Sequence, residues 1–175
     1  MKGEIIADSS FYICFLDCIQ DSKSLIRIID NFKMHLSKKI LEEISKSPNF
    51  HKIQDKKFNI FNNPNLNLGE ALRPFVTEEQ ISKGEHEVIV LAYVFNGMGI
   101  NFWVIIDEKS KRNLVKRIVP ELSDKLLGTI TFIELCNNEY HIFNKSESLI
   151  IFDKIASSNF RIKPELIKRA KNNLK

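Results

Sequence analysis

The sequence contains little glycine or proline and no long apolar run, and these shortages exclude several classes of protein. With 6 Gly and 5 Pro in 175 residues, it lacks the turn residues of a turn-rich all-β protein. Apolar runs such as FWVII are too short to span a bilayer. The start of the chain, MKGEIIADSS, has acids on both sides of its apolar run and no signal-peptide hydrophobic region. We therefore expect a cytoplasmic protein that does not associate with membranes.

Cysteine is also scarce, and the three that occur are expected to be reduced. An odd number of cysteines without a secretion signal is typical of free thiols. Cys14 and Cys18 are four residues apart on an expected helix, but two thiols do not complete a zinc site. Because free cysteines are commonly buried, we interpret Cys14 and Cys18 as core residues.

Several motifs that carry well-known chemistry are missing. The chain has no GxGxxG and no GxxxxGK[ST] for phosphate binding, and no GxSxG nucleophile turn. Its four histidines lack the spacing of zinc ligands. His86 lies between Glu85 and Glu87 but points to another side of its expected helix, and we expect it at the surface. Dinucleotide, P-loop, serine-hydrolase and zinc chemistry are thus without support.

What remains fits a single globular domain over residues 1–175. This length can bury a sizeable core, and 43% hydrophobic with 27% charged residues is not a composition of disordered chains. The net charge of +4 permits a polyanionic partner without requiring one. The stretch from 161 to 175 is strongly basic.

Short buried strands alternate with helices along the chain. This alternation predicts an α/β fold with a mostly parallel sheet covered on both faces. Ser9 or Ser10 is expected to cap the first helix. Residues 47–76 are irregular and rich in asparagine, and we interpret them as an insertion. The strands are expected at 2–8, 33–37, 100–107 and from 126; the main helices are expected at 9–20, 22–33, 38–47, 84–96, 109–119, from about 129, at 146–157 and near the end of the chain.

Acidic residues recur beside these apolar elements. Asp8 and Asp107 each close an expected strand, at the carboxyl edge where parallel sheets gather functional groups. Glu43 lies on a short helix, and Glu87 faces the apolar side of a buried helix with Glu85 beside it. Taken singly, each acid is explained as well by helix capping or by the helix dipole as by a function.

Brought together, such acids would need a cation. Two carboxylates about 4 Å apart repel by roughly 4 kcal/mol at an effective dielectric constant of 20. A cluster therefore persists only by protonating or by binding positive charge. Oxygen ligands alone suit Mg²⁺ or Mn²⁺, and such an ion can activate a water and hold a phosphate oxygen. The acids therefore favour metal-dependent phosphoryl chemistry.

The order and spacing of these motifs resemble the PIN-domain family, in particular its stand-alone VapC-like branch. The motifs are IIADSS, ILEEI, GEHEVIVLA and WVIIDE, followed by a Gly-Thr turn in LLGTITFIEL and by FRIKPELIKRA near the end. The resemblance covers nearly the whole chain and selects Glu43 over its neighbour Glu42. Where a second aspartate is expected in the last motif the chain has Asp-Glu, so Asp107 and Glu108 remain alternatives as the metal ligand.

The resemblance implies a three-layer α/β/α sandwich and a Mg²⁺- or Mn²⁺-dependent endoribonuclease. Members of this branch are often toxins neutralised by an antitoxin protein, and often homodimers. Asp8, Glu43, Glu87 and Asp107 would be catalytic. The implied metal ligands are Asp8, Glu43, Glu85, Glu87 and Asp107.

The sequence also contains candidate substrate-binding residues and permits other functions. Ser10 could assist by hydrogen bonding, and Lys109, Lys111 and Arg112 could hold the RNA backbone, although an ordinary solvated helix face explains these basic residues equally well. The alternative function is a catalytically silent PIN-like module that binds RNA or protein. A phosphatase or phospho-switch domain is disfavoured, because it would pair a second acid with Asp8 after the first strand.

Overall fold

Five short strands form one parallel sheet in the part of the chain that the structure describes. The structure is a computed structural model that describes residues 3–61 and 84–175. The sheet order is β3-β2-β1-β4-β5, and each of the four strand pairs is parallel. The predicted α/β class is confirmed. The strands are β1 (Glu4–Ala7), β2 (Lys33–Ser37), β3 (Asn59–Phe61), β4 (Phe102–Ile105) and β5 (Leu126–Leu127).

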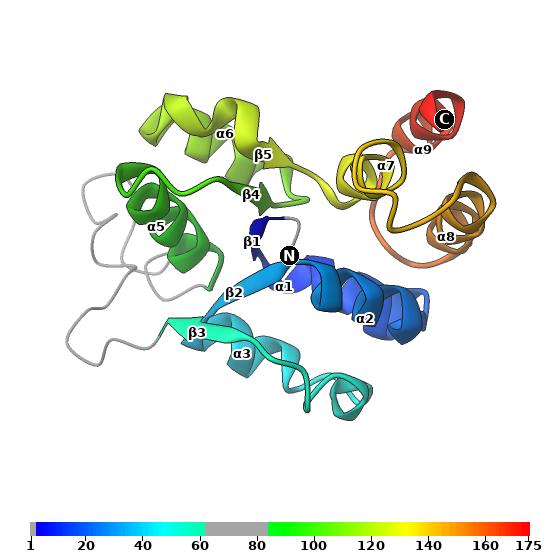
Figure 1. The fold of residues 1–175 in the computed structure, drawn as a ribbon, viewed down its shortest axis with the longest axis horizontal. Helices are drawn as coiled ribbons and strands as arrows, with labels where there is room; N and C mark the ends of the chain where they lie inside the picture. The colour runs from blue at the N-terminus through cyan, green and yellow to red at the C-terminus, as the bar shows by residue number, and fades with distance from the viewer. Residues whose placement is uncertain (1–2, 62–83) are drawn as a thin grey trace.

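Helices connect the strands and cover both faces, which gives the three-layer α/β/α sandwich. Figure 1 shows α5 on one side of the sheet and α1, α2 and α7 on the other. No helix in the described ranges is both long and apolar enough to cross a bilayer. The α-helices are α1 (Ser9–Ile13), α2 (Ser22–Asn31), α3 (Lys38–Ile44), α5 (Gly84–Gly97), α6 (Lys109–Ile118), α7 (Thr129–Asn138), α8 (Lys145–Ser157) and α9 (Pro164–Asn173); the other helical turns are η1 (Cys14–Cys18), η2 (Phe50–Lys52) and η4 (Pro120–Lys125).

The strand order reverses between β1 and β4, and this reversal positions the site. β1 pairs with β2 on one side and with β4 on the other, with Ala7 aligned to Ile105. Connections running toward β3 and connections running toward β5 therefore lie on opposite faces of the sheet. The carboxyl ends of β1 and β4 are left uncovered between them, which is where open α/β sheets bind ligands.

Asp8 caps the first helix, which confirms the capping interpretation of this acid, and neither Ser9 nor Ser10 is the cap. The Asp8 Oδ1 atom accepts a hydrogen bond from the Phe11 N–H at 3.3 Å. The helix also changes after Ile13 into a π-helical turn, η1, that the apolar spacing did not indicate. Turns of this kind are frequent near functional sites.

Part of the segment interpreted as an irregular insertion is ordered as sheet. β3 lies within it and pairs with β2, His35 being aligned with Asn59. Ser47 and Asn49 donate hydrogen bonds of 2.7 and 3.1 Å to Asp17 Oδ1, which ties the start of the segment to the first helix. The remainder of the predicted insertion, from 62 to 76, lies outside the described residues.

His86 and the cysteines show how thoroughly the core is covered. His86 is fully buried, so its predicted surface position was wrong. The reason is that α5 packs across β1, β2 and β4, and even its first turns are enclosed. Cys14 is buried, as predicted, and Cys136 is also buried, whereas Cys18 is half-buried.

An aromatic cluster joins the beginning of the chain to its last third. Phe132 on α7 makes edge contacts with Phe11 at 5.8 Å and a tilted contact with Phe32 at 5.5 Å between ring centroids. Phe32 also meets Tyr140 at 4.9 Å, and the Tyr140 hydroxyl accepts a hydrogen bond of 2.7 Å from the Trp103 indole. The cluster fixes α7 against α1 and so fixes the two sides of the site.

Replacement of Phe132 by alanine should strongly destabilise the protein. Its side chain is fully buried, and its removal loses transfer free energy and leaves a cavity between α7 and α1. We expect the free energy of unfolding in denaturant to fall by about 3–5 kcal/mol. Ile150→Ala is the control, since Ile150 is 55% exposed and its truncation should change stability by less than about 0.5 kcal/mol. Equal effects of the two substitutions would contradict the packing described here.

Candidate functional site

Asp8 and Asp107 lie side by side at the reversal of strand order. Asp8 follows β1, and its N–H donates to the Ile105 carbonyl at 3.0 Å, so the pairing of β1 with β4 continues to the acid itself. Asp107 comes two residues after β4 ends. The two acids are close enough that the charge of Asp107 raises the pKa of Asp8. The predicted convergence of these two strand-end acids is therefore present.

The surroundings of Asp8 make its ionisation costly. Burial is the main cause that raises the pKa of Asp8, to about 7, and repulsion from Asp107 adds to it. Hydrogen bonds oppose this increase: Ser10 Oγ donates to Asp8 Oδ1 at 2.6 Å, and the backbone of Phe11 and of Asp107 also contribute. At neutral pH this carboxyl group therefore holds a proton part of the time unless a cation is nearby.

Asp107 is held by the turn that begins α7. The Thr129 N–H donates to Asp107 Oδ1 at 2.8 Å, and Thr129 Oγ1 donates to Oδ2 at 2.5 Å. Burial raises the pKa of Asp107, while these two bonds and the charge of Arg112 act to lower it. Both oxygens are thus oriented, and the carboxylate cannot turn away from Asp8.

Gly128 allows this close packing. A Cβ atom at this position would lie 3.1 Å from Arg112 Nη1 and 3.2 Å from Asp107 Oδ1, which is tighter than most such contacts. Arg112 in turn donates from Nη1 to the carbonyls of Ile106 and Asp107, at 2.7 and 2.8 Å. The Gly-Thr turn noted in the sequence is therefore a support for Asp107, and Arg112 is a second support from the opposite side.

The acids open into one cleft of about 500 Å³. It brings together Asp8, Glu43 and Asp107 of the predicted site, as well as Ser10. Glu42 instead is exposed, and its Oε1 atom lies 3.9 Å from Lys38 Nζ. Residues from four separate parts of the chain line the cleft: Asp8, Ser9, Ser10, Ile13, Cys18, Glu43, Asp107, Glu108, Asn159, Phe160 and Arg161.

Glu87 is near the same edge of the sheet but does not line this cleft. It is buried in the first turn of α5, which must begin at the carboxyl edge because β4 follows it in parallel. Its Oε2 atom accepts from the Lys39 N–H at 3.4 Å, and Oε1 lies 3.9 Å from Lys39 Nζ. Glu87 therefore sits at the amino end of α3, the helix that carries Glu43. The side chain of Glu85 lies outside the described residues.

The donor chemistry of the cleft fits Mg²⁺ or Mn²⁺ in part. Asp8, Glu43 and Asp107 offer carboxylate oxygens, the ligands that these ions prefer. A cation would also relieve the repulsion that raises the pKa of Asp8. Among residues 3–61 and 84–175, however, no three His, Cys, Asp or Glu side chains are grouped closely enough to hold a metal ion. Asp8 and Asp107 are the pair around which such a site would form.

The predicted substrate cations lie elsewhere. Arg112 points inward to the two carbonyls, Lys111 is buried and Lys109 is exposed on α6. None of the three lines the cleft. Arg161, from the segment between α8 and α9, does line it. The sequence showed that this region is basic, but nothing in the sequence placed it beside Asp8.

Neutralising Asp8 should stabilise the metal-free protein at neutral pH. Because the pKa of Asp8 is about 7 in the folded protein and 3.8 in a free side chain, the unfolded chain loses this proton first as pH rises. The Asp8 contribution to stability therefore falls between about pH 4 and pH 7 and then stays constant. Asp8→Asn should match the wild type near pH 4 and exceed it by about 1–4 kcal/mol at pH 8.

Thermal melts from pH 4 to pH 8 in the presence of EDTA measure this difference. Asp55→Asn is the matched control, because Asp55 is exposed and its replacement should give no pH-dependent gain. A constant difference between Asp8→Asn and wild type across this range would contradict the account of Asp8.

Removing the Thr129 hydroxyl should raise the pKa of Asp107 further. Thr129→Val keeps the shape and the backbone donor but removes the donor to Oδ2. A buried carboxylate that loses such a donor should cost about 1–3 kcal/mol of stability at neutral pH. Carboxyl-carbon NMR titration measures the pKa, and Thr131→Val on the same helix is the control. An unchanged Asp107 titration would show that the hydroxyl does not act on this carboxylate.

Comparisons with known proteins found no relative from which a function could be inferred. A scan against models of known families, a search of curated proteins and a search of solved structures each found no match. The likeness to the PIN-domain family accordingly stays a prediction that rests on the order of the motifs. The geometry of the cleft must carry any statement about function.

Proposed function

We propose that this protein is a metal-dependent endoribonuclease that hydrolyses RNA phosphodiester bonds. One observation carries the proposal: buried Asp8 and half-buried Asp107 adjoin at the reversal of strand order and share a cleft with Glu43. Buried like charges are costly, and proteins retain them chiefly where they serve chemistry. The motifs that resemble the PIN family supply these same three acids.

In this proposal Asp8, Glu43 and Asp107 hold Mg²⁺ or Mn²⁺. When bound, the ion would supply an activated water and stabilise charge on the phosphate. Ser10 holds the Asp8 carboxylate through its 2.6 Å hydrogen bond, and Thr129 orients Asp107. Glu87 acts on the position of Glu43, since it binds the first turn of α3. Glu85 remains a predicted ligand, and Glu108 remains the alternative to Asp107 at the rim.

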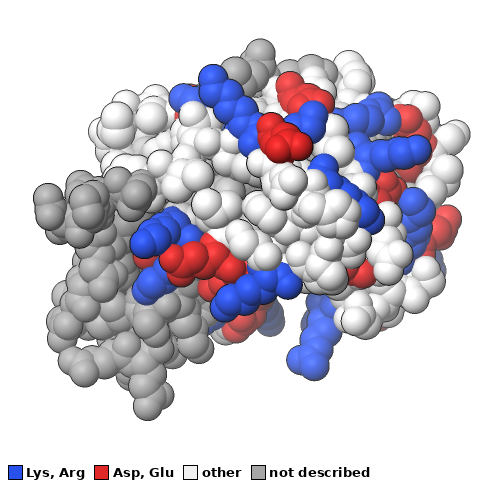
Figure 2. All heavy atoms as spheres, turned by 90° about the horizontal axis from the view of Figure 1, so that it is seen from below, with Lys and Arg blue, Asp and Glu red and all other residues white. Residues whose placement is uncertain are grey.

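The surface charge gives no broad attraction for RNA on the face drawn in Figure 2. Figure 2 shows acidic and basic side chains interspersed in a larger uncharged surface on the face that it draws. With a net charge of +4, attraction for a polyanion would come from individual contacts near the site. We further propose, from the family resemblance alone, a cytoplasmic toxin with a cognate antitoxin that acts as a homodimer.

A silent module that binds RNA or protein is the second candidate. It is favoured by the lack of a three-residue metal-binding group in the described ranges and by the contact of Glu87 with Lys39. The two candidates differ in their response to metal. A working metal site should raise the melting temperature with Mn²⁺ concentration, whereas a silent module should show almost no rise.

Cleavage of single-stranded RNA tests the proposal. We expect the wild type to cut a labelled RNA with Mn²⁺ or Mg²⁺ and not with EDTA. Asp8→Asn and Glu43→Gln should each lower the rate by at least about 100-fold, because each removes an acid of the metal-binding set. Glu42→Gln should retain activity within about 3-fold, because this neighbour is exposed and outside the cleft.

Melting with Mn²⁺ is the companion measurement. The increase in melting temperature should be present in the wild type and in Glu42→Gln, and absent in Asp8→Asn. Undiminished cleavage by Asp8→Asn would refute the proposed nuclease. Metal-independent binding of RNA without any cleavage would favour the silent module.

A further inference from the structure

We propose that the segment from Ser158 to Lys163 is the substrate-binding lip of the acidic cleft, with Arg161 binding an RNA phosphate. This inference rests on the proposed function. Asn159, Phe160 and Arg161 line the same cleft as Asp8 and Asp107. The end of the chain thus supplies one wall of a site whose acids come from β1, α3 and β4.

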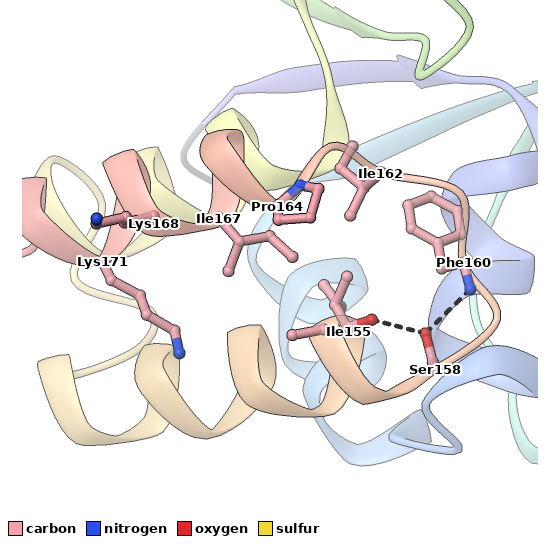
Figure 3. A pocket seen from close by; sticks show the side chains of 9 residues that line it. Ile155, Ser158, Phe160, Ile162, Pro164, Ile167, Lys168 and Lys171 are labelled. Atoms are coloured by element: carbon pink, nitrogen blue, oxygen red, sulfur yellow. Dashed lines mark hydrogen bonds between the residues drawn. The ribbon is translucent and has the colours of Figure 1, made fainter.

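The segment is held firmly at both of its ends. The Ser158 hydroxyl donates to the Ile155 carbonyl at 2.9 Å and accepts from the Phe160 N–H at 3.1 Å (Figure 3). Pro164 begins α9, where its fixed backbone angle suits the first helical turn. A segment anchored in this way loses little freedom when it binds a ligand.

Alternation along the segment directs Arg161 outward. Phe160 and Ile162 are half-buried and pack against the core, whereas Arg161 between them is exposed. In Figure 3 the side chains of Ile155, Ile162 and Ile167 point into the space between α8 and α9. This apolar packing anchors the segment, and Arg161 between the two half-buried side chains stays exposed.

Arg161 brings positive charge to a cleft whose other charged residues are acidic. Its other charged lining residues are four acids, Asp8, Glu43, Asp107 and Glu108, and such a lining repels RNA. Arg161 makes no ion pair with any residue in the described ranges, so its guanidinium is available to a ligand. A guanidinium binds phosphate oxygens in a bidentate manner, which lysine cannot reproduce. The lip therefore offsets the repulsion at the point where the phosphate must approach the acids.

Arg161→Ala should weaken RNA binding more than it slows the chemical step. We expect KM for a single-stranded RNA to rise about 10-fold while kcat changes by less than about 3-fold. Loss of one phosphate contact should also reduce the slope of log Kd against log salt by about 0.7. Arg161→Lys should restore the salt slope but recover only part of the affinity, because the charge returns without the planar pair of donors.

Arg169→Ala is the matched control. Arg169 is exposed on α9 and does not line the cleft, and its replacement by alanine removes the same positive charge. Binding is measured by fluorescence anisotropy of a labelled RNA in EDTA, where metal-dependent cleavage stops. Equal affinities and salt slopes for Arg161→Ala and Arg169→Ala would overturn the inference.

The binding and cleavage measurements separate this inference from the proposed nuclease. If the wild type cleaves RNA and Arg161→Ala behaves like the control, the proposed binding role of the lip is refuted and the proposed nuclease activity is supported. If the wild type binds RNA without cleaving it and Arg161→Ala binds more weakly than the control, the binding role of the lip is supported and the proposed nuclease activity is refuted. If the wild type neither binds nor cleaves RNA, both are overturned.

Discussion

The burial of the Asp8 carboxylate beside a second carboxylate, Asp107, is the constraint on which the site depends. Asp8 and Asp107 lie together because β1 and β4 pair in register, Asp8 directly follows β1, and Asp107 comes two residues after β4. The pKa of Asp8 rises to about 7, mainly through burial. A fold that served stability alone would place a neutral cap at Asp8, since asparagine or serine caps a helix as well. The proposed cation between the acids would offset this cost.

Much of the surrounding structure keeps those acids in place. Thr129 holds both oxygens of Asp107, and Gly128 leaves room for Arg112 to bind the carbonyls beside it. Ser10 holds Asp8 at the start of α1. The aromatic cluster around Phe132 connects α7, which begins at Thr129, to α1, which begins after Asp8. The core thus fixes the distance between the two halves of the site.

The sequence predicted the parts of this arrangement that depend on local pattern. A buried strand followed by an acid is visible at Asp8 and again at Asp107, and parallel strands bring such ends to one edge. Contacts between residues of different helices and strands could not be predicted from such local patterns. Arg112 belongs to a basic run that resembles a solvated helix face, yet its partners are carbonyls at the end of β4. The burial of His86 likewise depends on how α5 lies across the sheet.

The proposed role of Arg161 would make a modest net charge compatible with a polyanionic substrate. A cleft lined by acids excludes RNA unless positive charge arrives with the metal or from the protein. A broad basic surface would bind RNA at many positions and would not select the phosphate that faces the acids. One guanidinium, held beside the acids by a segment anchored in the core, adds attraction at that position only. Charge placed this way would add to the affinity for the substrate at the position that faces the acids.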